Sequence, residues 1–211
     1  MSGFDSRIEY GRGSLDVTTV DPDPIRQFER WFAEAQEASV QEPNAMTLAT
    51  ATPDGVPSAR VVLLKGVDPG GFVFFTDYRS RKGTELAANP EAALVFFWQP
   101  LERQVRVVGR VSRTSPEESA GYFATRPEGS RLGAWSSVQS SVISGRDQLE
   151  ALVARTKSRF EGQEMVCPPH WGGFRLAPRT LEFWQGRANR LHDRVLYRRE
   201  SDRWVIERLA P

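Results

Sequence analysis

Three basic side chains near the C-terminus are spaced so that one ligand could engage them all. In the sequence RLHDR, Arg190, His192 and Arg194 alternate with other residues. If this stretch is extended, alternate side chains point to the same side of the strand, and the three lie in a row. Two aromatic residues, Phe183 and Trp184, stand just upstream. Such a row beside an indole indicates a site for a flat, anionic ligand, although an arginine-rich strand is also often a plain solvated face.

A second basic group lies in the sequence FFTDYRSRKG. Thr76 ends an apolar run there, and Ser80, Arg81 and Lys82 open a predicted helix. The first turn of a helix has free backbone N–H groups and a positive dipole end, which favour an anion. Two cations at this place oppose the dipole unless an anion compensates them. The motif therefore predicts a phosphate site, with exposed cations as the alternative.

A third group combines Tyr122 and Arg126, four residues apart on a predicted helix, with Ser130 just beyond Pro127. Residues at this spacing are neighbours on one helical face. A phenol, a guanidinium and a hydroxyl can together hold a second phosphate, since a guanidinium offers two parallel hydrogen bonds. Tyrosine–arginine pairs are common on helices, so this pattern alone decides little. The polar run SSVQSS at 136–141 offers small donors or is an ordinary loop.

The apolar sequence ARVVLLKG begins near Arg60 and finishes near Lys65. Strict alternation along a strand places these two side chains on opposite faces. Either a twist or bulge brings them to one site, or they serve different parts of a site. In a third interpretation both simply extend to water from the strand ends.

The motifs of acid–base, nucleophilic and metal chemistry are missing from the sequence. No paired carboxylates stand out, and there is neither a nucleophile elbow nor a phosphate-binding P-loop. Cys167, His170 and His192 are too few for an ordinary zinc site, so we expect no metal. A site rich in cations but poor in acids, bases and metal ligands indicates that a bound cofactor supplies the reactivity.

The segments that must position these residues are mostly strands. Apolar and β-branched runs predict strands at 45–52, 59–67, 71–77, 91–99, 103–113, 172–178, 180–186, 193–200 and 203–211. Helical spacing and capping residues predict helices at 21–39, 80–90, 115–127 and 144–160. The connections between the early strands are too short for helical crossovers. We therefore expect a mainly β, α+β fold with a mostly antiparallel barrel or sandwich.

Size and composition fit one globular domain. The chain has 211 residues, of which 39% are hydrophobic and 26% charged, with a formal net charge of +1. We predict a flexible N-terminal arm at 1–20, followed by a single domain at 21–211. The near-neutral charge argues against a nucleic-acid or membrane-surface protein. A single cysteine excludes an intrachain disulfide, and with no signal peptide or apolar span we expect a cytoplasmic protein.

With these residues in view, the sequence resembles the pyridoxine/pyridoxamine 5′-phosphate oxidase family along nearly its whole length. The resemblance is carried by EPNAM, RVVLLK, FFTDYRSRKG, ERQVRVVG, YFATRP, GAWSSVQSS, WGGFRL, EFWQG, RLHDR and the terminal ERLAP. Each motif is short, but their order and spacing together are specific. The arm adds Arg7 and Tyr10, which look like the lid that the family closes over its substrate.

The resemblance implies an FMN-binding split β-barrel that works as a homodimer, with each flavin between two subunits. The residues it implies for FMN are Arg60, Val61, Val62, Leu63, Leu64, Lys65, Phe75, Thr76, Arg81, Lys82 and Gln104, with Gln139, Ser140, Trp184 and Arg194 from the partner chain. The residues it implies for the substrate are Arg7, Tyr10, Lys65, Tyr122, Arg126, Ser130, Arg190, Leu191 and His192. Among these, Arg190 and His192 would act at the reacting centre.

The activity that the resemblance implies is oxidation of pyridoxamine or pyridoxine 5′-phosphate to pyridoxal 5′-phosphate by dioxygen. Hydrogen peroxide is the second product, and the amine also releases ammonia. One alternative is a split-barrel reductase that uses a deazaflavin, and another is a non-catalytic carrier of flavin or pyridoxal phosphate. The sequences RLHDR and YFATRP favour the oxidase over both. A nucleic-acid binder is the weakest alternative, because the sequence has no basic run.

Overall fold

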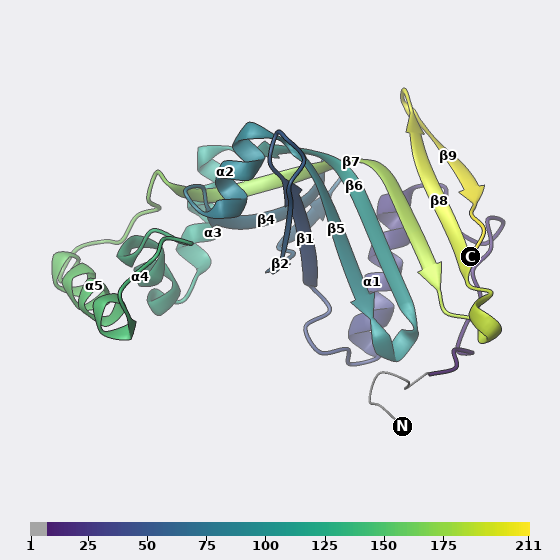
Figure 1. Ribbon diagram of the computed structural model, residues 1–211, viewed down its shortest axis with the longest axis horizontal. Helices are drawn as coiled ribbons and strands as arrows, with labels where there is room; N and C mark the ends of the chain where they lie inside the picture. The colour runs from purple at the N-terminus through teal and green to yellow at the C-terminus, as the bar shows by residue number, and fades with distance from the viewer. Residues whose placement is uncertain (1–7) are drawn as a thin grey trace.

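The computed structural model describes residues 8–211 of the chain, which fold around one curled antiparallel β-sheet (Figure 1). Its strands are β1 (Ala45–Ala51), β2 (Pro57–Leu63), β3 (Gly66–Asp68), β4 (Gly71–Asp77), β5 (Glu91–Trp98), β6 (Arg103–Arg113), β7 (Trp171–Gln185), β8 (Asp193–Glu200) and β9 (Arg203–Arg208). The helices are α1 (Pro24–Glu37), α2 (Arg81–Ala88), α3 (Pro116–Thr125), α4 (Glu128–Ser136) and α5 (Arg146–Arg159), with short 3₁₀ turns η1 (Gln99–Leu101) and η2 (Ala188–Arg190).

The sheet branches at β7, because this strand is long enough to pair with two strands, β4 and β8, along one edge. The main strand order is β2-β1-β5-β6-β7-β4-β3, and β8 and β9 continue from the second half of β7. Residues 171–176 of β7 pair with β4, and residues 180–185 pair with β8. The predicted mainly antiparallel β architecture with flanking helices is confirmed.

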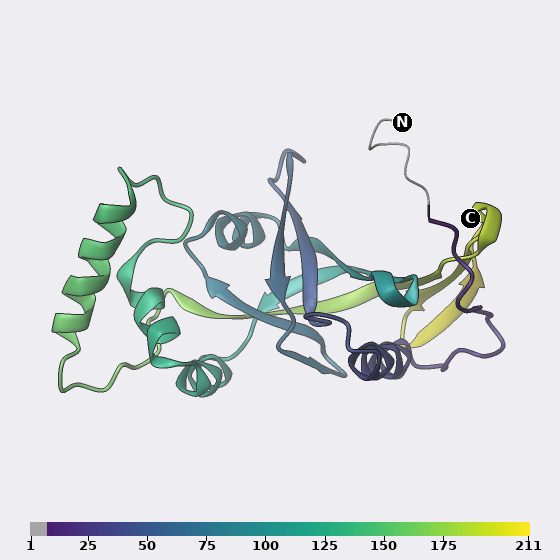
Figure 2. The same ribbon diagram turned by 90° about the horizontal axis from the view of Figure 1, so that it is seen from below.

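Helix α1 closes one face of the sheet and builds most of the core with it (Figure 2). Asp23 caps its first turn by accepting the Ile25 N–H. Phe28 packs 4.9 Å from the ring centre of Phe96, and Trp31 packs edge-on against Phe183 at 5.2 Å. Burying one such aromatic side chain contributes about 2–3 kcal/mol to the free energy of unfolding. The apolar face of α1 and the inner face of the sheet therefore form one continuous core.

One strand of the structure differs from its sequence-based interpretation. The segments 172–178 and 180–186, expected as separate strands, form the single strand β7. Its pairing with β6 shifts between Thr180, which faces Val108, and Pro178, which faces Gly109, so that Arg179 forms a bulge. A proline is tolerated at such a bulge, where the ladder lacks a hydrogen bond. A Cβ on Gly109 would lie 2.0 Å from the Ala177 carbonyl oxygen, so only glycine fits there.

The N-terminal segment and the helices α4 and α5 lie at opposite ends of the molecule (Figure 1). Residues 8–20 contain neither helix nor strand, yet Leu15 is buried in the core. Arg7 lies outside the described residues, and the predicted mobility of the arm stays a prediction. Helix α4 was not expected from the sequence, whereas α5 forms as predicted. Among residues 8–211 no helix has the length and apolar character to cross a membrane.

Candidate active site

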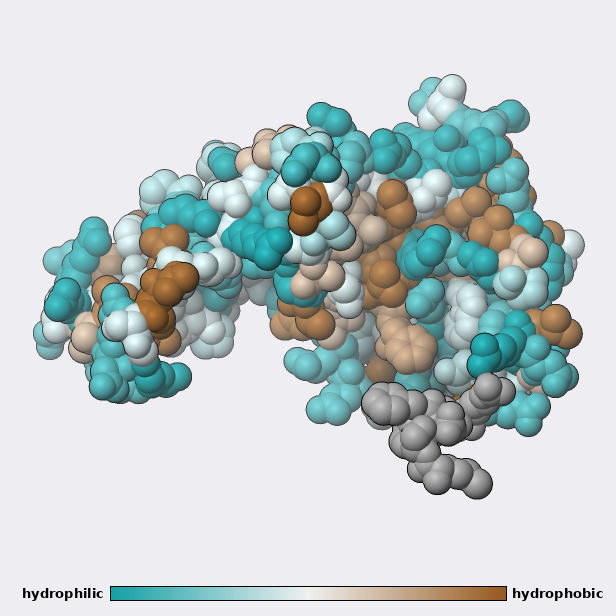
Figure 3. All heavy atoms as spheres, in the orientation of Figure 1, coloured by the Kyte–Doolittle hydropathy of each residue, from teal (hydrophilic) through white to brown (hydrophobic). Residues whose placement is uncertain are grey.

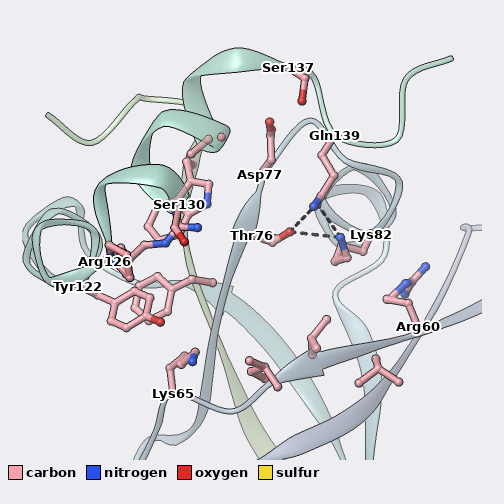
Figure 4. A pocket seen from close by; sticks show the side chains of 18 of the residues that line it. Arg60, Lys65, Thr76, Asp77, Lys82, Tyr122, Arg126, Ser130, Ser137 and Gln139 are labelled. Atoms are coloured by element: carbon pink, nitrogen blue, oxygen red, sulfur yellow. Dashed lines mark hydrogen bonds between the residues drawn. The ribbon is translucent and has the colours of Figure 1, made fainter. Parts of the chain in front are cut away.

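A cavity of about 850 Å³ opens between β2, β4, α2 and the helices α3 and α4 (Figure 4). The predicted cofactor and substrate residues that line it are Arg60, Val61, Val62, Leu63, Lys65, Phe75, Thr76, Lys82, Tyr122, Arg126, Ser130 and Gln139. Three basic motifs far apart in the sequence therefore meet around one space. Cations stand on two of its sides.

A break in the strand explains how Arg60 and Lys65 both reach the cavity. Strand β2 ends at Leu63, and the Lys65 N–H then donates to the Val73 carbonyl oxygen at 2.8 Å. The chain thus leaves its pairing with β1 and joins β4, which cancels the alternation that would set the two side chains on opposite faces. Of the alternatives left open by the sequence, a local irregularity is the one found. Leu64, between them, is buried in the core.

Lys82 reaches into the cavity from the first turn of α2. Only 9% of the residue is exposed, and its Nζ donates to Gln139 Oε1 at 2.8 Å and to Thr76 Oγ1 at 3.2 Å (Figure 4). Ser80 caps the helix, accepting the Gly83 N–H. Burial, and next the charge of Arg60, lower the pKa of Lys82. A buried ammonium group at a helix N-terminus is well placed to hold an anion.

Arg81, the neighbouring cation, points elsewhere. Its Nε lies 2.8 Å from Glu85 Oε1, one turn along α2, and 60% of its side chain is exposed. It does not line the cavity. Successive residues of a helix point about 100° apart, so Arg81 and Lys82 leave the helix in different directions. The structure separates the predicted pair.

Gln139 contacts the predicted FMN residues of its own chain. The resemblance assigned Gln139 and Ser140 to the partner chain, yet Gln139 lines the cavity of its own chain and bonds to Lys82 there. The assignment of both residues to the partner chain stays a prediction. Ser140 is exposed, has a left-handed backbone with φ 72°, and lies outside the cavity lining.

A buried carboxylate, Glu85, holds Arg60 in place. The hydroxyls of Ser58 and Thr50 donate to Glu85 Oε2, and Arg60 Nη2 lies 3.3 Å from the same oxygen. Burial works to raise the pKa of Glu85, but the hydrogen bonds from Ser58, Thr50, Arg81 and Arg60 prevail and lower the pKa to about 2. Glu85 therefore stays ionised and fixes the guanidinium at the cavity edge.

Replacing Glu85 with glutamine should lower the free energy of unfolding by about 2 kcal/mol at pH 7. The folded pKa of about 2 lies below the ordinary 4.5, so this stabilisation is present above pH 4.5 and is lost as the pH falls towards 2. Urea unfolding at a fixed protein concentration between pH 7 and pH 3 measures both effects. Glu150→Gln removes an exposed ion pair with Arg146 and should change stability by less than about 0.5 kcal/mol. A pH-independent difference between wild type and Glu85→Gln would contradict the assignment.

The far side of the cavity is an aromatic wall with a guanidinium on it. Phe75 stacks on Tyr122 with ring centres 4.1 Å apart and on Trp171 at 5.5 Å. The Arg126 guanidinium lies over the Trp171 ring at 4.5 Å, and its Nη1 is buried without a hydrogen-bond partner in the described chain. Burial lowers the pKa of Arg126. An unsatisfied buried cation is costly, so this group points to an anionic ligand.

A second cavity of about 620 Å³ lies at the other end of the chain. Its lining includes Tyr10, Arg190 and His192. The Tyr10 ring meets Trp184 edge-on at 5.8 Å, and the His192 ring lies 4.6 Å from Trp184. His192 Nδ1 accepts the Arg187 N–H at 3.1 Å, which places the proton of the neutral ring on Nε2.

The stretch RLHDR is not the straight strand that the row of basic residues required. Residues Ala188–Arg190 form the turn η2, and β8 begins only at Asp193. Asn189 and Arg190 both have a positive φ, so the alternation of faces does not extend to them. The predicted row is wrong, although Arg190 and His192 still line one cavity. Leu191 points to solvent and is 66% exposed.

Gln104, Trp184 and Arg194 form a different row across the sheet. Gln104 on β6 pairs with Trp184 on β7, which pairs with Arg194 on β8. Residues directly opposite in antiparallel strands are close enough to act together. The Arg194 Nε donates to Glu182 Oε1 at 2.8 Å. These three residues, predicted for FMN, lie outside the lining of the first cavity.

Comparison with known proteins identifies the family. Residues 32–160 match the family model described as pyridoxamine 5′-phosphate oxidase, which is more than half of the chain. The chain belongs to the pyridoxamine 5′-phosphate oxidase family. Residues 171–211 match the model described as the pyridoxine 5′-phosphate oxidase C-terminal dimerisation region. The resemblance seen in the sequence is confirmed, and membership places the chain among oxidoreductases.

Relatives in the pyridoxamine 5′-phosphate oxidase family cover almost the whole chain. A protein of Rubrobacter xylanophilus named pyridoxine/pyridoxamine 5′-phosphate oxidase is 60% identical over 205 residues, covering 97% of this chain and 94% of that one. A protein of Paraburkholderia xenovorans with the same name is 60% identical over 207 residues, 97% of each chain.

Solved structures confirm the family's split barrel. The crystal structure of PhzG from Burkholderia lata, in complex with tetrahydrophenazine-1-carboxylic acid, has a TM-score of 0.87 at 33% identity and covers 94% of this chain and all of that chain. A Nostoc punctiforme protein described as pyridoxamine 5′-phosphate oxidase-related and FMN-binding has a TM-score of 0.72 at 18% identity, covering 91% of this chain and all of its own.

Some residues of this family member's site were not singled out from the sequence. Trp171 forms the back of the aromatic wall, and Glu85 orients Arg60. Trp171 lies in the motif WGGFRL, and Glu85 follows RKGT within a predicted helix, but the sequence predicted no role for either residue. A signal for Glu85 exists in principle, because it follows Arg81 at the i,i+4 spacing of a helical ion pair.

Proposed function

We propose that the protein oxidises pyridoxamine 5′-phosphate and pyridoxine 5′-phosphate to pyridoxal 5′-phosphate, with FMN as cofactor and dioxygen as electron acceptor. Hydrogen peroxide forms in both cases, and water releases ammonia from the oxidised amine. The observation that carries this proposal is the arrangement of cations on two sides of one cavity, with Lys82 and Arg60 on one side and Arg126 on the other. Two such groups fit two phosphorylated ring compounds held together.

The side of Lys82 is the place for the FMN phosphate. Lys82 lies in the first turn of α2, where the helix dipole adds to its charge, and the Arg60 guanidinium and the Thr76 hydroxyl line the same cavity. These residues would hold FMN, which would supply the two-electron oxidation chemistry at the substrate's C4′ position, with dioxygen as the final electron acceptor. The chain's own contribution is to hold and orient both ligands, which lowers a barrier by several kcal/mol.

The side of Arg126 is the place for the substrate phosphate. Arg126 Nη1 lacks a partner in the described chain, and Lys65, Tyr122 and Ser130 line the same part of the cavity (Figure 4). Lys65 Nζ lies 6.0 Å from the Tyr122 ring centre. A phosphate there would satisfy the buried guanidinium with charge-assisted hydrogen bonds.

A homodimer completes the site, because the remaining residues lie too far away within one chain. The turn between β7 and β8, which carries Arg190 and His192, stands at the end of the molecule opposite to α4 (Figure 1). A partner can bring its own copy of this turn to the cavity. Val61 and Phe97 are exposed apolar residues, and hydrophobic side chains gather over the central strands (Figure 3). The match of 171–211 to a dimerisation region supports the same arrangement.

The visible spectrum of the purified protein tests cofactor and activity together. A yellow protein should bleach when pyridoxamine 5′-phosphate is added without oxygen and should recover its colour when air is admitted. Pyridoxal 5′-phosphate and hydrogen peroxide should then appear in equal amounts. A colourless protein that does not take up FMN, or a yellow one that neither phosphate substrate bleaches, would refute the proposal. Peroxide-free turnover would favour the deazaflavin reductase instead.

A second candidate function follows from the similarity to PhzG, whose structure holds tetrahydrophenazine-1-carboxylic acid. In this alternative the chain oxidises such a tricyclic carboxylic acid. The cavity favours the phosphate substrates, because Arg126, Lys65, Tyr122 and Ser130 offer more donors than one carboxylate needs. Bleaching by the tricyclic acid but not by pyridoxamine 5′-phosphate would reverse the assignment.

Arg190 is assigned to steer the reacting C4′ group, with His192 beside it on the ring. Replacing Arg190 with alanine should lower kcat at least about tenfold while the fraction of FMN retained stays unchanged. Burial and the charge of Arg190 both lower the pKa of His192, so the variant should also move the pKa of His192 upwards. Steady-state kinetics and an NMR titration of the imidazole measure these effects. Equal losses of turnover and FMN would contradict the role.

A further inference from the structure

One buried carboxylate at the end of the sheet has no part in the proposed chemistry, yet it binds the N-terminal segment. Glu102 follows the turn η1 between β5 and β6 and is 8% exposed. Its Oε2 accepts two successive backbone N–H groups, from Gly11 at 2.8 Å and from Arg12 at 2.9 Å. Some ninety residues separate the partners in the sequence, so this contact decides where the segment lies.

The main chain of Glu102 is tied to the same place. Its carbonyl oxygen accepts the Gly186 N–H at 2.7 Å. Its backbone is left-handed, with φ 55°, a conformation that costs energy for a residue other than glycine. The surrounding contacts therefore hold Glu102 in one orientation, with its carboxylate towards the segment. Gly186 in turn makes room for Tyr10, because a Cβ on Gly186 would lie 2.7 Å from the Tyr10 ring.

These contacts place Tyr10 on the second cavity. Tyr10 directly precedes the clamped residues, and its ring packs against Trp184 and His192 with centres 5.8 Å and 6.1 Å away. A second carboxylate holds the segment further along, since Asp193 Oδ2 accepts the Leu15 N–H at 3.1 Å. The described start of the chain accordingly runs beside β8 and β9 (Figure 2). Tyr10 thus directly precedes the stretch 11–15, which Glu102 holds at one end and Asp193 at the other.

We infer that Glu102 is a positioning residue for substrate binding: its carboxylate fixes Gly11 and Arg12 so that Tyr10 forms a wall of the cavity beside His192. The kinetic part of this inference rests on the proposed function, in which His192 contacts the substrate ring. The structural part does not, because the hydrogen bonds of Glu102 to Gly11 and Arg12 lie within one chain. Glu102 acts through Tyr10 and touches no reacting atom.

Residue-resolved hydrogen exchange of the protein without added substrate tests the clamp directly. In Glu102→Ala, the amide hydrogens of Gly11 and Arg12 should exchange at least about tenfold faster than in wild type. Glu102→Gln keeps one acceptor oxygen but loses the charge, so its exchange should lie between the two. It also serves if the alanine variant fails to fold. Glu34→Gln is the matched control, since Glu34 pairs with the adjacent Arg103 and not with the segment. Unchanged exchange at Gly11 and Arg12 in both Glu102 variants would overturn the inference.

Kinetics with pyridoxamine 5′-phosphate test whether the clamp acts through Tyr10. Glu102→Ala should raise KM about fivefold, with kcat within about twofold of wild type and FMN retention unchanged. In a Tyr10→Ala background the same change should raise KM no further, because the residue it positions is gone. Additive effects on KM, or a loss confined to kcat, would refute the positioning role. If wild type itself shows no turnover, the proposed function fails while the exchange result still decides the clamp.

Discussion

Replacing Arg126 with alanine is expected to raise KM for pyridoxamine 5′-phosphate about 100-fold, with kcat changed much less. The guanidinium lies over the Trp171 ring, 4.5 Å from its centre, and its Nη1 is buried without a partner in the described chain. A phosphate held there gains charge-assisted hydrogen bonds that cost no rearrangement. Because these bonds are made to the non-reacting end of the substrate, they stabilise bound substrate and transition state alike.

Two further variants make the test specific for Arg126. Arg126→Lys keeps the charge but loses the planar pair of donors, so KM should rise by an intermediate amount, about tenfold. Arg113 also stacks on an aromatic ring, that of Tyr78 at 4.1 Å, but does not line the cavity. Arg113→Ala should therefore leave KM unchanged. A KM for Arg126→Ala near that of wild type would place the substrate phosphate elsewhere.

The fold was largely predictable because its elements carry local signals. Pro24 marks the start of α1, Ser115 and Pro116 mark the start of α3, and Ser115 is confirmed as the N-cap of α3. The runs that became β4, β5 and β6 are dense in β-branched and aromatic residues. The missed helix α4 has weak helix formers, including Gly129 and Gly133. Its helical state depends on contacts with α5, which no local pattern records.

The site was predictable as a set of motifs but not as a geometry. Arg60 and Lys65 face one cavity only because the chain changes partner strands between them, an event set by pairing with β4. The failure of the row in RLHDR has a similar origin, since the positive φ of Asn189 and Arg190 belongs to a tertiary turn. Glu102 gave no signal, because its partners are backbone N–H groups distant in the sequence. Long-range backbone contacts are what the sequence does not record.

Lys82 lines the cavity and Arg81 does not, so the two neighbouring cations should contribute very differently to FMN binding. Replacing Lys82 with methionine is expected to weaken FMN binding about 100-fold, because the buried ammonium group stands at the cavity and methionine keeps its length without its charge. Arg81→Met removes a neighbouring cation that is 60% exposed and already paired with Glu85, and it should weaken binding by less than about fivefold.

Titrating each apoprotein with FMN, and following the quenching of flavin fluorescence, measures the two affinities under one condition. Both variants lower the net charge by one, so a general loss of positive potential would weaken FMN binding equally in the two. A large difference would support the proposed direct contact between Lys82 and the FMN phosphate. Raised ionic strength should change the ratio of the two FMN affinities little, because a buried ion pair is screened much less than an exposed one. Equal losses in the two variants would contradict a special role of the buried Lys82 ammonium group in FMN binding.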